Sequence, residues 1–349
     1  MRPEDLLRPI GRFRDGRMVY RVEEGAPPFG YIAFGVIDRG TNVVQVRPTT
    51  ICPQSCGFCS VDAGPFSARR WAEYVVDLGV VVRGVREAVR VKGAGVEALI
   101  DTIGDPLTYP ELPALVRKLK EAGAARVALE THGALLTRRV IERLWESGLD
   151  RVNFSIETLD PEKARQLYGV RWYDLSRAID AIEYAARDLG MDIHVTSVWL
   201  PGVNDEDLRR IAEWAYRSVA GRVPPFTIQK YVVHKYGRRM PGVRPVSWKS
   251  FWRQIERWER EWGVRLRWSM EEWGMRYARR VEAPLRRGDE VEATIVGRGW
   301  LRGECLALAP TRPAWWVAIR GPCRGRVTAK IVRDKDGLLL GKALGIATS

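Results

Sequence analysis

Three cysteines near the start of the chain are the residues best suited to chemistry. Cys52, Cys56 and Cys59 are spaced C-x₃-C-x₂-C in the stretch ICPQSCGFCS. Pro53 and Gly57 interrupt both helix and strand, so we expect an irregular loop in which three sulfur atoms can face one centre. Soft thiolate ligands of this kind select zinc, copper(I) or an iron–sulfur cluster.

The number of ligands separates these metals. A closed structural zinc site needs four ligands, whereas no fourth cysteine lies near the loop and the first downstream histidine is His132. A four-iron cluster held by three cysteines leaves one iron without a protein ligand. The alternatives are a zinc knuckle, or three buried cysteines that are close only by chance.

The cysteine spacing resembles the signature of the radical S-adenosylmethionine (SAM) superfamily, which Cys52, Cys56 and Cys59 match position for position. This resemblance implies a 4Fe-4S cluster whose open iron is chelated by SAM. It also implies an electron donor such as a ferredoxin or flavodoxin, and a 5′-deoxyadenosyl radical that takes a hydrogen atom from the substrate. The cofactors carry this chemistry, and the sequence identifies no catalytic side chain of its own.

The elements that must position the loop follow an alternating pattern. After a lead-in over residues 1–41, six strand-like segments alternate with helices, one of them expected from about Ala72 to Val91. Such alternation predicts an α/β fold with a parallel sheet and right-handed crossovers. The resemblance sharpens this to a partial (βα)₆ TIM-type barrel over residues 42–283, with its chemistry at the carboxyl ends of the strands.

The last part of the chain, residues 284–349, has a different composition, with short β-rich runs broken by Gly and Pro. Regular short strands predict a small all-β barrel. The order resembles a TRAM domain, an OB-like RNA-binding barrel. The resemblance rests on Gly288-Asp289, the turn from Gly297 to Gly303, the stretch from Gly321 to Gly325 and the closing KIVRDKDGLLLGKAL. The whole arrangement is similar to archaeal radical SAM proteins with a TRAM tail.

A SAM pocket is implied by short polar motifs at the predicted strand ends. Ile103-Gly104-Asp105-Pro106 stands where related enzymes usually carry Gly-Gly-Glu-Pro, with Ile in place of the first Gly and Asp in place of the Glu. The resemblance gives Asp105 the SAM amino group; alternatively, Asp105 caps the next helix. His132 either donates toward SAM or substrate, or satisfies a loop carbonyl. The other positions implied for SAM are Phe58, Thr131, Ser155, Glu157 and Ser197.

The charge of the chain points weakly to a polyanionic partner. Its formal net charge is +14, which is a statement about partners and not about fold. A basic loop at the end of the sixth strand either binds phosphate or is a solvated run of charges. The candidates for phosphate binding are Lys230, His234, Lys235, Arg238 and Arg239. The Trp-rich segment from Ser247 to Trp262 is expected to be a helix with its stripe of aromatic side chains in the core.

The C-terminal segment supplies a second set of RNA candidates. Trp315 and Trp316 are adjacent in a predicted strand, so one should face inward and one outward. An outward Trp either stacks an RNA base or packs against the catalytic domain. The candidates for RNA contact are Arg312, Trp316, Arg320 and Arg324. Cys305 and Cys323 are expected to be small hydrophobes or a disulfide; a methyl-accepting cysteine is the alternative.

These observations predict a cytoplasmic radical SAM enzyme that modifies RNA, with tRNA the leading candidate, delivered by the C-terminal barrel. The alternative is a radical SAM enzyme acting on a peptide or small metabolite, with the barrel as a docking or oligomerisation module. A third possibility is a non-catalytic RNA-binding protein with a structural cluster. No segment has the apolar length of a membrane span, and the charged N-terminus has no signal-like apolar region.

Overall fold

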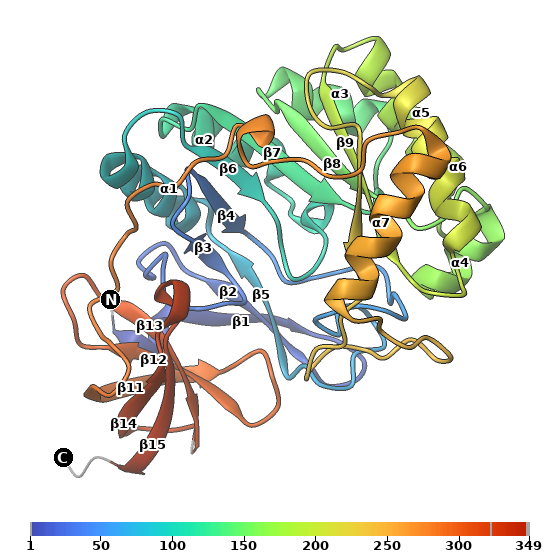
Figure 1. The fold of residues 1–349 in the computed structure, drawn as a ribbon. Helices are drawn as coiled ribbons and strands as arrows, with labels where there is room; N and C mark the ends of the chain where they lie inside the picture. Colours follow the sequence, from blue (N-terminus) through green and yellow to red (C-terminus); the bar gives the residue numbers. More distant parts are fainter. Residues whose placement is uncertain (1, 322, 347–349) are drawn as a thin grey trace. The chain divides into compact units, whose positions relative to one another are not determined.

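The computed structural model describes residues 2–321 and 323–346, which group into two compact units (Figure 1). The first unit comprises the described residues of Met1–Ile51, Ala68–Arg126 and Tyr277–Ser349. The second unit comprises Cys52–Ser67 and Val127–Arg276. The cysteine loop therefore belongs to the second unit, and the segments on either side of it belong to the first.

Two strands of the predicted parallel series lie in the first unit. β4 (Val43–Arg47) pairs in parallel with β6 (Glu97–Ile100), and β3 (Gly35–Asp38) pairs antiparallel with β4. The helices of this unit are α1 (Leu78–Lys92) and α2 (Leu112–Glu121). α2 buries Leu112, Leu115, Val116 and Leu119, which is the helical spacing expected from the sequence.

One boundary in this unit differs from the expectation. The predicted helix from about Ala72 is wrong at its start, because β5 (Ala72–Val76) is a strand and α1 begins at Leu78. The Asp77 side chain accepts a hydrogen bond from the Gly79 amide at 2.9 Å and so fixes the beginning of the helix. β5 pairs in parallel with β2 (Met18–Val22), which pairs with β1 (Leu7–Arg12). The lead-in thus contributes strands.

The second unit holds the other four strands of the alternating series. They run in the order β7 (Arg126–Thr131), β8 (Arg151–Ser155), β9 (Asp192–Trp199) and β10 (Phe226–Lys230), and all are parallel. The helices of this unit are α3 (Arg138–Glu146), α4 (Pro161–Tyr168), α5 (Leu175–Arg187), α6 (Asp205–Ser218) and α7 (Trp248–Trp262). All six predicted strands are therefore present, and the α/β fold class is confirmed.

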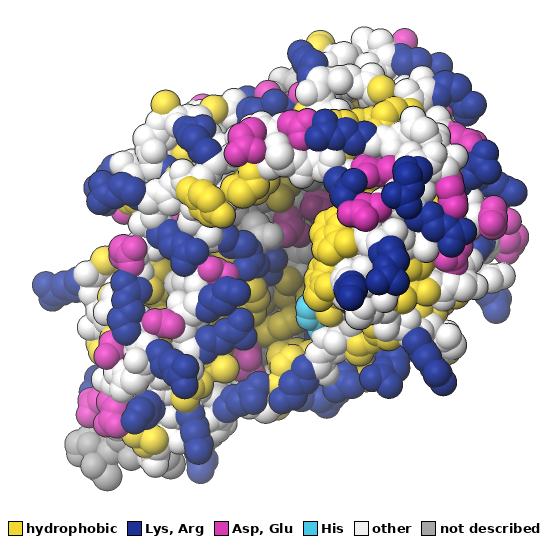
Figure 2. Space-filling view, viewed as in Figure 1, with side chains coloured by type: hydrophobic (Ala, Val, Ile, Leu, Met, Phe, Trp, Pro, Cys, Tyr) yellow, Lys and Arg dark blue, Asp and Glu magenta, His cyan; other side chains and the backbone are white. Residues whose placement is uncertain are grey.

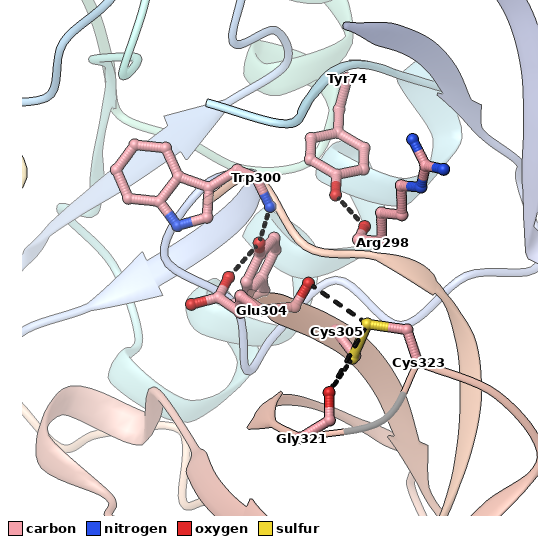
Figure 3. The surroundings of a disulfide bond; sticks show 8 residues. Tyr74, Arg298, Trp300, Glu304, Cys305, Gly321 and Cys323 are labelled. Carbon is pink, nitrogen blue, oxygen red and sulfur yellow. Dashed lines mark hydrogen bonds between the residues drawn. A yellow bond between two sulfur atoms is a disulfide. The ribbon is translucent and has the colours of Figure 1, made fainter. Parts of the chain in front are cut away.

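The C-terminal segment forms the small all-β barrel that the sequence predicts. It closes in the order β11-β12-β13-β15-β14, with strands β11 (Glu290–Arg298), β12 (Glu304–Ala309), β13 (Trp315–Arg320), β14 (Arg326–Arg333) and β15 (Leu340–Ile346). Alternate side chains such as Val327, Ala329 and Ile331 are buried in β14. Cys305 and Cys323 form a disulfide (Figure 3), one of the two expected outcomes.

Within the first unit the barrel packs on the N-terminal segment through aromatic rings. Trp315 stacks on Phe29 with centroids 5.1 Å apart. The Tyr31 hydroxyl donates to the Glu304 carboxylate at 2.7 Å and accepts from the Trp300 amide at 2.7 Å. Burial raises the pKa of Glu304 to about 7. The barrel is therefore an integral part of this unit.

In the described part of the chain, no helix is both long enough and apolar enough to cross a membrane.

Candidate active site

The cysteine loop is held from one side by the end of α4. The Ser55 amide donates to the Tyr168 carbonyl at 2.9 Å, and the Gly57 amide donates to the Leu167 carbonyl at 3.0 Å. Gly169, the C-cap of α4, has φ 65°, and a Cβ there would lie 2.5 Å from the Ser55 carbonyl oxygen. Only glycine fits this close approach without a shift of the loop.

The other side of the loop is held by Arg238. Its Nε lies 2.8 Å from Asp62 Oδ1, and its two terminal nitrogens donate to the carbonyls of Cys56 at 3.1 Å and Ala63 at 2.6 Å. The Arg238 amide also donates to the Cys59 carbonyl at 2.8 Å. The expectation that Arg238 grips phosphate is therefore wrong, since its guanidinium is already committed to ordering the loop.

The donor set of the loop fits an iron–sulfur cluster. Cys56 is buried, whereas Cys52 and Cys59 are partly exposed. Burial raises the pKa of Cys56, and the nearby charges of Cys52 and Cys59 raise it further, which places the three thiols in one neighbourhood. Among the described residues, no three His, Cys, Asp or Glu side chains gather closely enough for a single metal ion. A cluster instead receives each thiolate on a separate iron.

A buried acid and an imidazole lie beside the loop, at the carboxyl ends of β7 and β8. Glu157 is fully buried, and its carboxylate accepts hydrogen bonds from the Tyr168 hydroxyl at 2.9 Å and the Val198 amide at 3.2 Å. Burial raises its pKa to about 7. His132 Nδ1 lies 3.8 Å from Glu157 Oε2. This pair is well placed to hold or move a proton next to the cluster loop.

His132 is neutral at neutral pH, because burial lowers its pKa to about 4. Its ring is 27% exposed, yet the Nδ1 atom is buried and has no hydrogen-bond partner within the described chain. An unpartnered buried nitrogen is costly, so a ligand atom that satisfies it would bind favourably. Phe58 lies edge-on to the ring with centroids 6.4 Å apart. The His132 ring also has a hydrogen bond with the backbone of Ser155, as in the alternative interpretation, and its contact with SAM or substrate stays a prediction.

The Gly104 motif lies in the first unit, next to the residue before Cys52. The Asp105 amide donates to the Ile51 carbonyl at 2.9 Å, and a Cβ on Gly104 would lie 2.2 Å from that carbonyl oxygen. Asp105 Oδ1 accepts from the Leu107 amide at 2.9 Å and so caps the 3₁₀ turn Pro106–Thr108. Asp105 thus acts as the cap that was the alternative interpretation, and its contact with SAM stays a prediction.

Arg70 is a site residue that the sequence did not reveal. Its side chain is fully buried, and Nη1 donates to the Thr50 carbonyl at 2.8 Å while Nη2 donates to the Ile103 carbonyl. Arg70 thereby links the backbone just before the cysteine loop to the backbone just before Gly104. Nothing in the SARRW stretch distinguished it from a surface arginine.

The remaining strand-end residues serve the local backbone. Thr131 Oγ1 accepts from the Gly133 amide at 2.9 Å, and the Ser197 hydroxyl donates to the Ile156 carbonyl. Ser155 is buried at the end of β8. Their contacts with SAM stay predictions.

The RNA candidates of the C-terminal barrel divide into buried and exposed residues. Trp316 is fully buried, and its indole nitrogen donates to the Pro27 carbonyl at 2.7 Å. It cannot present a face to a base, so that expectation is wrong; Trp315 is buried as well. Neighbouring residues of one strand are both covered because the N-terminal segment packs on the outer face. Arg312, Arg320 and Arg324 are exposed.

The candidate residues of the basic loop after β10 also differ in exposure. His234, Lys235 and Arg239 are exposed, which is compatible with binding to phosphate. Lys230 is half-buried, and its Nζ lies 5.1 Å from the centre of the Trp248 ring.

Comparison with known proteins identifies the family of these residues. Residues 46–215 match the sequence profile of the Radical SAM superfamily. An uncharacterised protein of Methanocaldococcus jannaschii is 30% identical over 348 residues, which cover 93% of this chain and 80% of the relative. A GTP 3′,8-cyclase of Rhizobium etli is 30% identical over 202 residues, 55% of this chain. The chain spans about half the length of that cyclase (54%).

Solved structures agree on the fold. The crystal structure of Streptococcus suis SuiB bound to the precursor peptide SuiA has a TM-score of 0.50 at 17% identity, over 66% of this chain and 48% of that one. The FeFe-hydrogenase maturase HydG from Carboxydothermus hydrogenoformans has a TM-score of 0.50 at 15% identity, over 66% of this chain and 55% of that one. The fold is therefore an α/β partial barrel of the TIM type, as the sequence predicts.

Proposed function

Because the chain belongs to the radical SAM superfamily and is a radical SAM enzyme that uses a 4Fe-4S cluster and SAM, we propose that it modifies RNA, with tRNA the leading candidate. Cys52, Cys56 and Cys59 are the residues that would hold the cluster. When bound, the cluster and SAM supply reductive cleavage of the sulfonium and abstraction of a hydrogen atom, with the electron from an external donor such as a ferredoxin or flavodoxin.

The chain's own residues would order this site and control its protons. Arg238 and the end of α4 fix the loop so that the thiolates keep one geometry. The Glu157 carboxyl, with its raised pKa and its hydrogen bond from Tyr168, holds a proton near neutral pH. The buried Nδ1 of His132 offers a polar contact to SAM or to the substrate. Buried Phe58 excludes water beside it.

The observation that carries the RNA proposal is a row of cations across the C-terminal barrel. Arg320 pairs in register with Lys342, and Lys342 pairs with Lys330 on the next strand. All three side chains are exposed. Like charges placed opposite each other on a sheet are destabilising, so a phosphate that neutralises Lys342 and Lys330 would bind favourably. Two acids flank the row in register, the exposed Glu290 beside Lys330 and the buried Glu304 beside Arg320.

We assign residues 284–349 to a TRAM-like module and residues 42–283 to the radical SAM segment. The closed five-strand barrel and its cationic row support this assignment. We place the enzyme in the cytoplasm, because its three free cysteines must stay reduced to bind iron.

Nucleoside mass spectrometry of total tRNA tests the proposal. Cells lacking the gene should lose one modified nucleoside, which returns with the wild-type gene but not with Cys56→Ala. Purified protein should also bind tRNA, and Lys330→Gln with Lys342→Gln should weaken binding and lower its salt dependence by roughly one unit for each phosphate that is no longer neutralised. An unchanged nucleoside profile together with no tRNA binding would favour a peptide or small-metabolite substrate. Charge variants are preferred to truncation because the barrel shares a compact unit with residues 68–126.

A further inference from the structure

The first two turns of α7 expose a pair of tryptophans. α7 buries Phe251, Ile255 and Trp258, as its helical stripe predicts, but Trp248 and Trp252 are 57% and 47% exposed. The expectation that the whole stripe is core is therefore wrong at these two positions. The two indoles lie near-parallel, with centroids 6.4 Å apart and an interplanar angle of 24°. Figure 2 shows hydrophobic side chains bordered by Lys and Arg where Figure 1 places this part of α7.

Three cations lie next to the pair in space or in sequence. Lys230, the last residue of β10, has its Nζ 5.1 Å from the Trp248 ring. Lys249 and Arg253 follow the two tryptophans directly on the same turns of α7 and are exposed. In the described part of the chain neither of them forms an ion pair. Lys230 thus contacts one indole, and Lys249 and Arg253 are exposed sequence neighbours of the pair that no acid of the described chain neutralises.

Carboxylates are absent from this part of the sequence. From Phe226 to Ile255 there is no Asp or Glu, whereas Lys and Arg occur seven times: Lys230, Lys235, Arg238, Arg239, Arg244, Lys249 and Arg253. Among the residues that the structure describes, only Arg238 of these seven is paired with an acid, Asp62 of the cysteine loop. The next acid along α7, Glu256, lies 2.7 Å from Arg267. The stretch of chain that carries the tryptophans is therefore rich in cations and free of acids.

An aromatic surface edged by free cations suits one class of macromolecule. A single strand of RNA presents flat bases that stack on aromatic rings and phosphates that pair with Lys or Arg. A peptide partner rich in acids would use the cations but would leave the indole faces unused. The pair also lies beside Lys230 at the carboxyl end of β10, the edge at which barrels of this type carry their chemistry.

We infer that Trp248 and Trp252, with Lys230, Lys249 and Arg253, form a stacking platform for single-stranded nucleotides of the RNA substrate. The inference rests on the proposed function and deepens it. The platform holds bases that flank the nucleotide to be modified, at the strand-end edge of the second unit. It acts separately from the cationic row of the C-terminal barrel.

Equilibrium binding to two RNA probes tests the platform. The probes are unfractionated tRNA and a 12-nucleotide oligoadenylate, measured with full-length wild-type protein, Trp248→Ala and Trp252→Ala. Removal of one stacking partner should raise the Kd for oligoadenylate roughly tenfold, and Trp252→Phe should restore most of the affinity. Trp145→Ala and Trp172→Ala are matched controls, because these indoles are 46% and 50% exposed on other helices or loops. Both controls should bind as the wild type does.

A second pair of variants separates charge from stacking. Lys249→Gln with Arg253→Gln should lower the salt dependence of oligoadenylate binding by roughly 0.7 for each phosphate that is no longer neutralised, whereas Trp252→Ala should leave that slope unchanged. Thermal unfolding shows whether each variant is folded; a variant that unfolds early is replaced by its phenylalanine counterpart.

The outcomes distinguish the platform from the proposed function. If wild-type protein binds tRNA but the Trp248 and Trp252 variants bind both probes as tightly as the controls do, the platform is wrong and RNA modification stands. If the control variants lose as much affinity, stacking is not specific to α7 and the platform is again wrong. If the wild type binds neither probe, the proposed function fails and the platform fails with it.

Discussion

Arg70 and Glu73 form a fully buried ion pair, with Arg70 Nη1 2.9 Å from Glu73 Oε2. Glu73 also accepts from Arg17 at 2.5 Å and from the Thr50 hydroxyl at 2.6 Å. The pair stands directly behind the backbone that leads into the cysteine loop. Arg70 binds Glu73 and donates to the carbonyls of Thr50 and Ile103, so the ion pair orders that backbone.

Replacing Arg70 by Met should be strongly destabilising. The change leaves two carbonyls without donors and a buried carboxylate with less compensation, at a cost of about 3 kcal/mol or more in the free energy of unfolding. Urea denaturation of the apoprotein measures it. Arg90→Met is the control, because its partner Glu87 lies on the surface, and its midpoint should match the wild type. Equal midpoints for the two variants would contradict an ordering role for Arg70.

Breaking the Arg238–Asp62 pair should weaken cluster binding. Asp62→Asn removes the charge that orients the Arg238 guanidinium, which otherwise holds the Cys56 and Ala63 carbonyls. Residues that orient metal ligands typically change affinity by roughly 10- to 100-fold. Iron and sulfide content after anaerobic reconstitution is the measurement, and it should fall well below the wild-type value. Arg239→Gln changes the exposed neighbouring cation and should load normally; equal loading of all three proteins would refute this role.

The buried Glu157 should make the stability depend on pH. Its folded-state pKa of about 7 lies above the ordinary value of 4.5, so between these values the folded chain holds a proton that the unfolded chain has released. The free energy of unfolding therefore falls as pH rises through this window, by about 3 kcal/mol at roughly 1.36 kcal/mol per pH unit. Glu157→Gln removes this dependence.

Urea denaturation of the apoproteins at pH 5 and pH 8 checks the sign. The free energy of unfolding of Glu157→Gln minus that of the wild type should be more positive at pH 8 than at pH 5. Glu304→Gln should behave in the same direction, because burial raises that pKa to about 7 as well. A stability difference from the wild type that is equal at the two pH values would show that Glu157 is ionised throughout.

The disulfide should stabilise the C-terminal barrel. Cys305 and Cys323 are separated by 18 residues, and closing a loop of this length restricts the unfolded chain by about 3 kcal/mol in the chain-entropy account. Cys305→Ala with Cys323→Ala should therefore lower the melting temperature of the apoprotein. Addition of a strong reductant should lower the melting temperature of the wild type but leave that of the variant unchanged. A wild type that ignores the reductant would mean that the bond does not form in solution.

Local patterns predicted the elements well where one physical rule decides the outcome. The six strands and the amphipathic α2 follow from apolar periodicity, and the cysteine loop follows from ligand spacing. The error at Ala72 arose because EYVV suits a strand as well as a helix, and pairing with β2 decides between them. The start of α1 therefore depends on a strand that is distant in sequence.

The contacts of single side chains were the least predictable. Trp316 looked like an outward aromatic because the N-terminal segment that covers it is far away in sequence: its hydrogen-bond partner Pro27 lies 289 residues earlier. Arg238 looked like a free cation because its partner Asp62 lies in the cysteine loop, far back in the chain. Arg70 gave no signal for the same reason. Each role depends on a tertiary neighbour that spacing does not reveal.

The barrel's place beside residues 68–126 has a consequence for biosynthesis. The Trp71 amide donates to the Trp300 carbonyl at 2.6 Å, and the backbones of Arg70 and Leu301 form an antiparallel β-bridge. The first unit can therefore be completed only after the last part of the polypeptide has been made. Residues 127–276 emerge from the ribosome before that part and can fold first. The segments that flank the cysteine loop end at Ile51 and resume at Ala68, and both belong to the unit that the barrel completes, so we expect them to become fully ordered only after the last strands have been made.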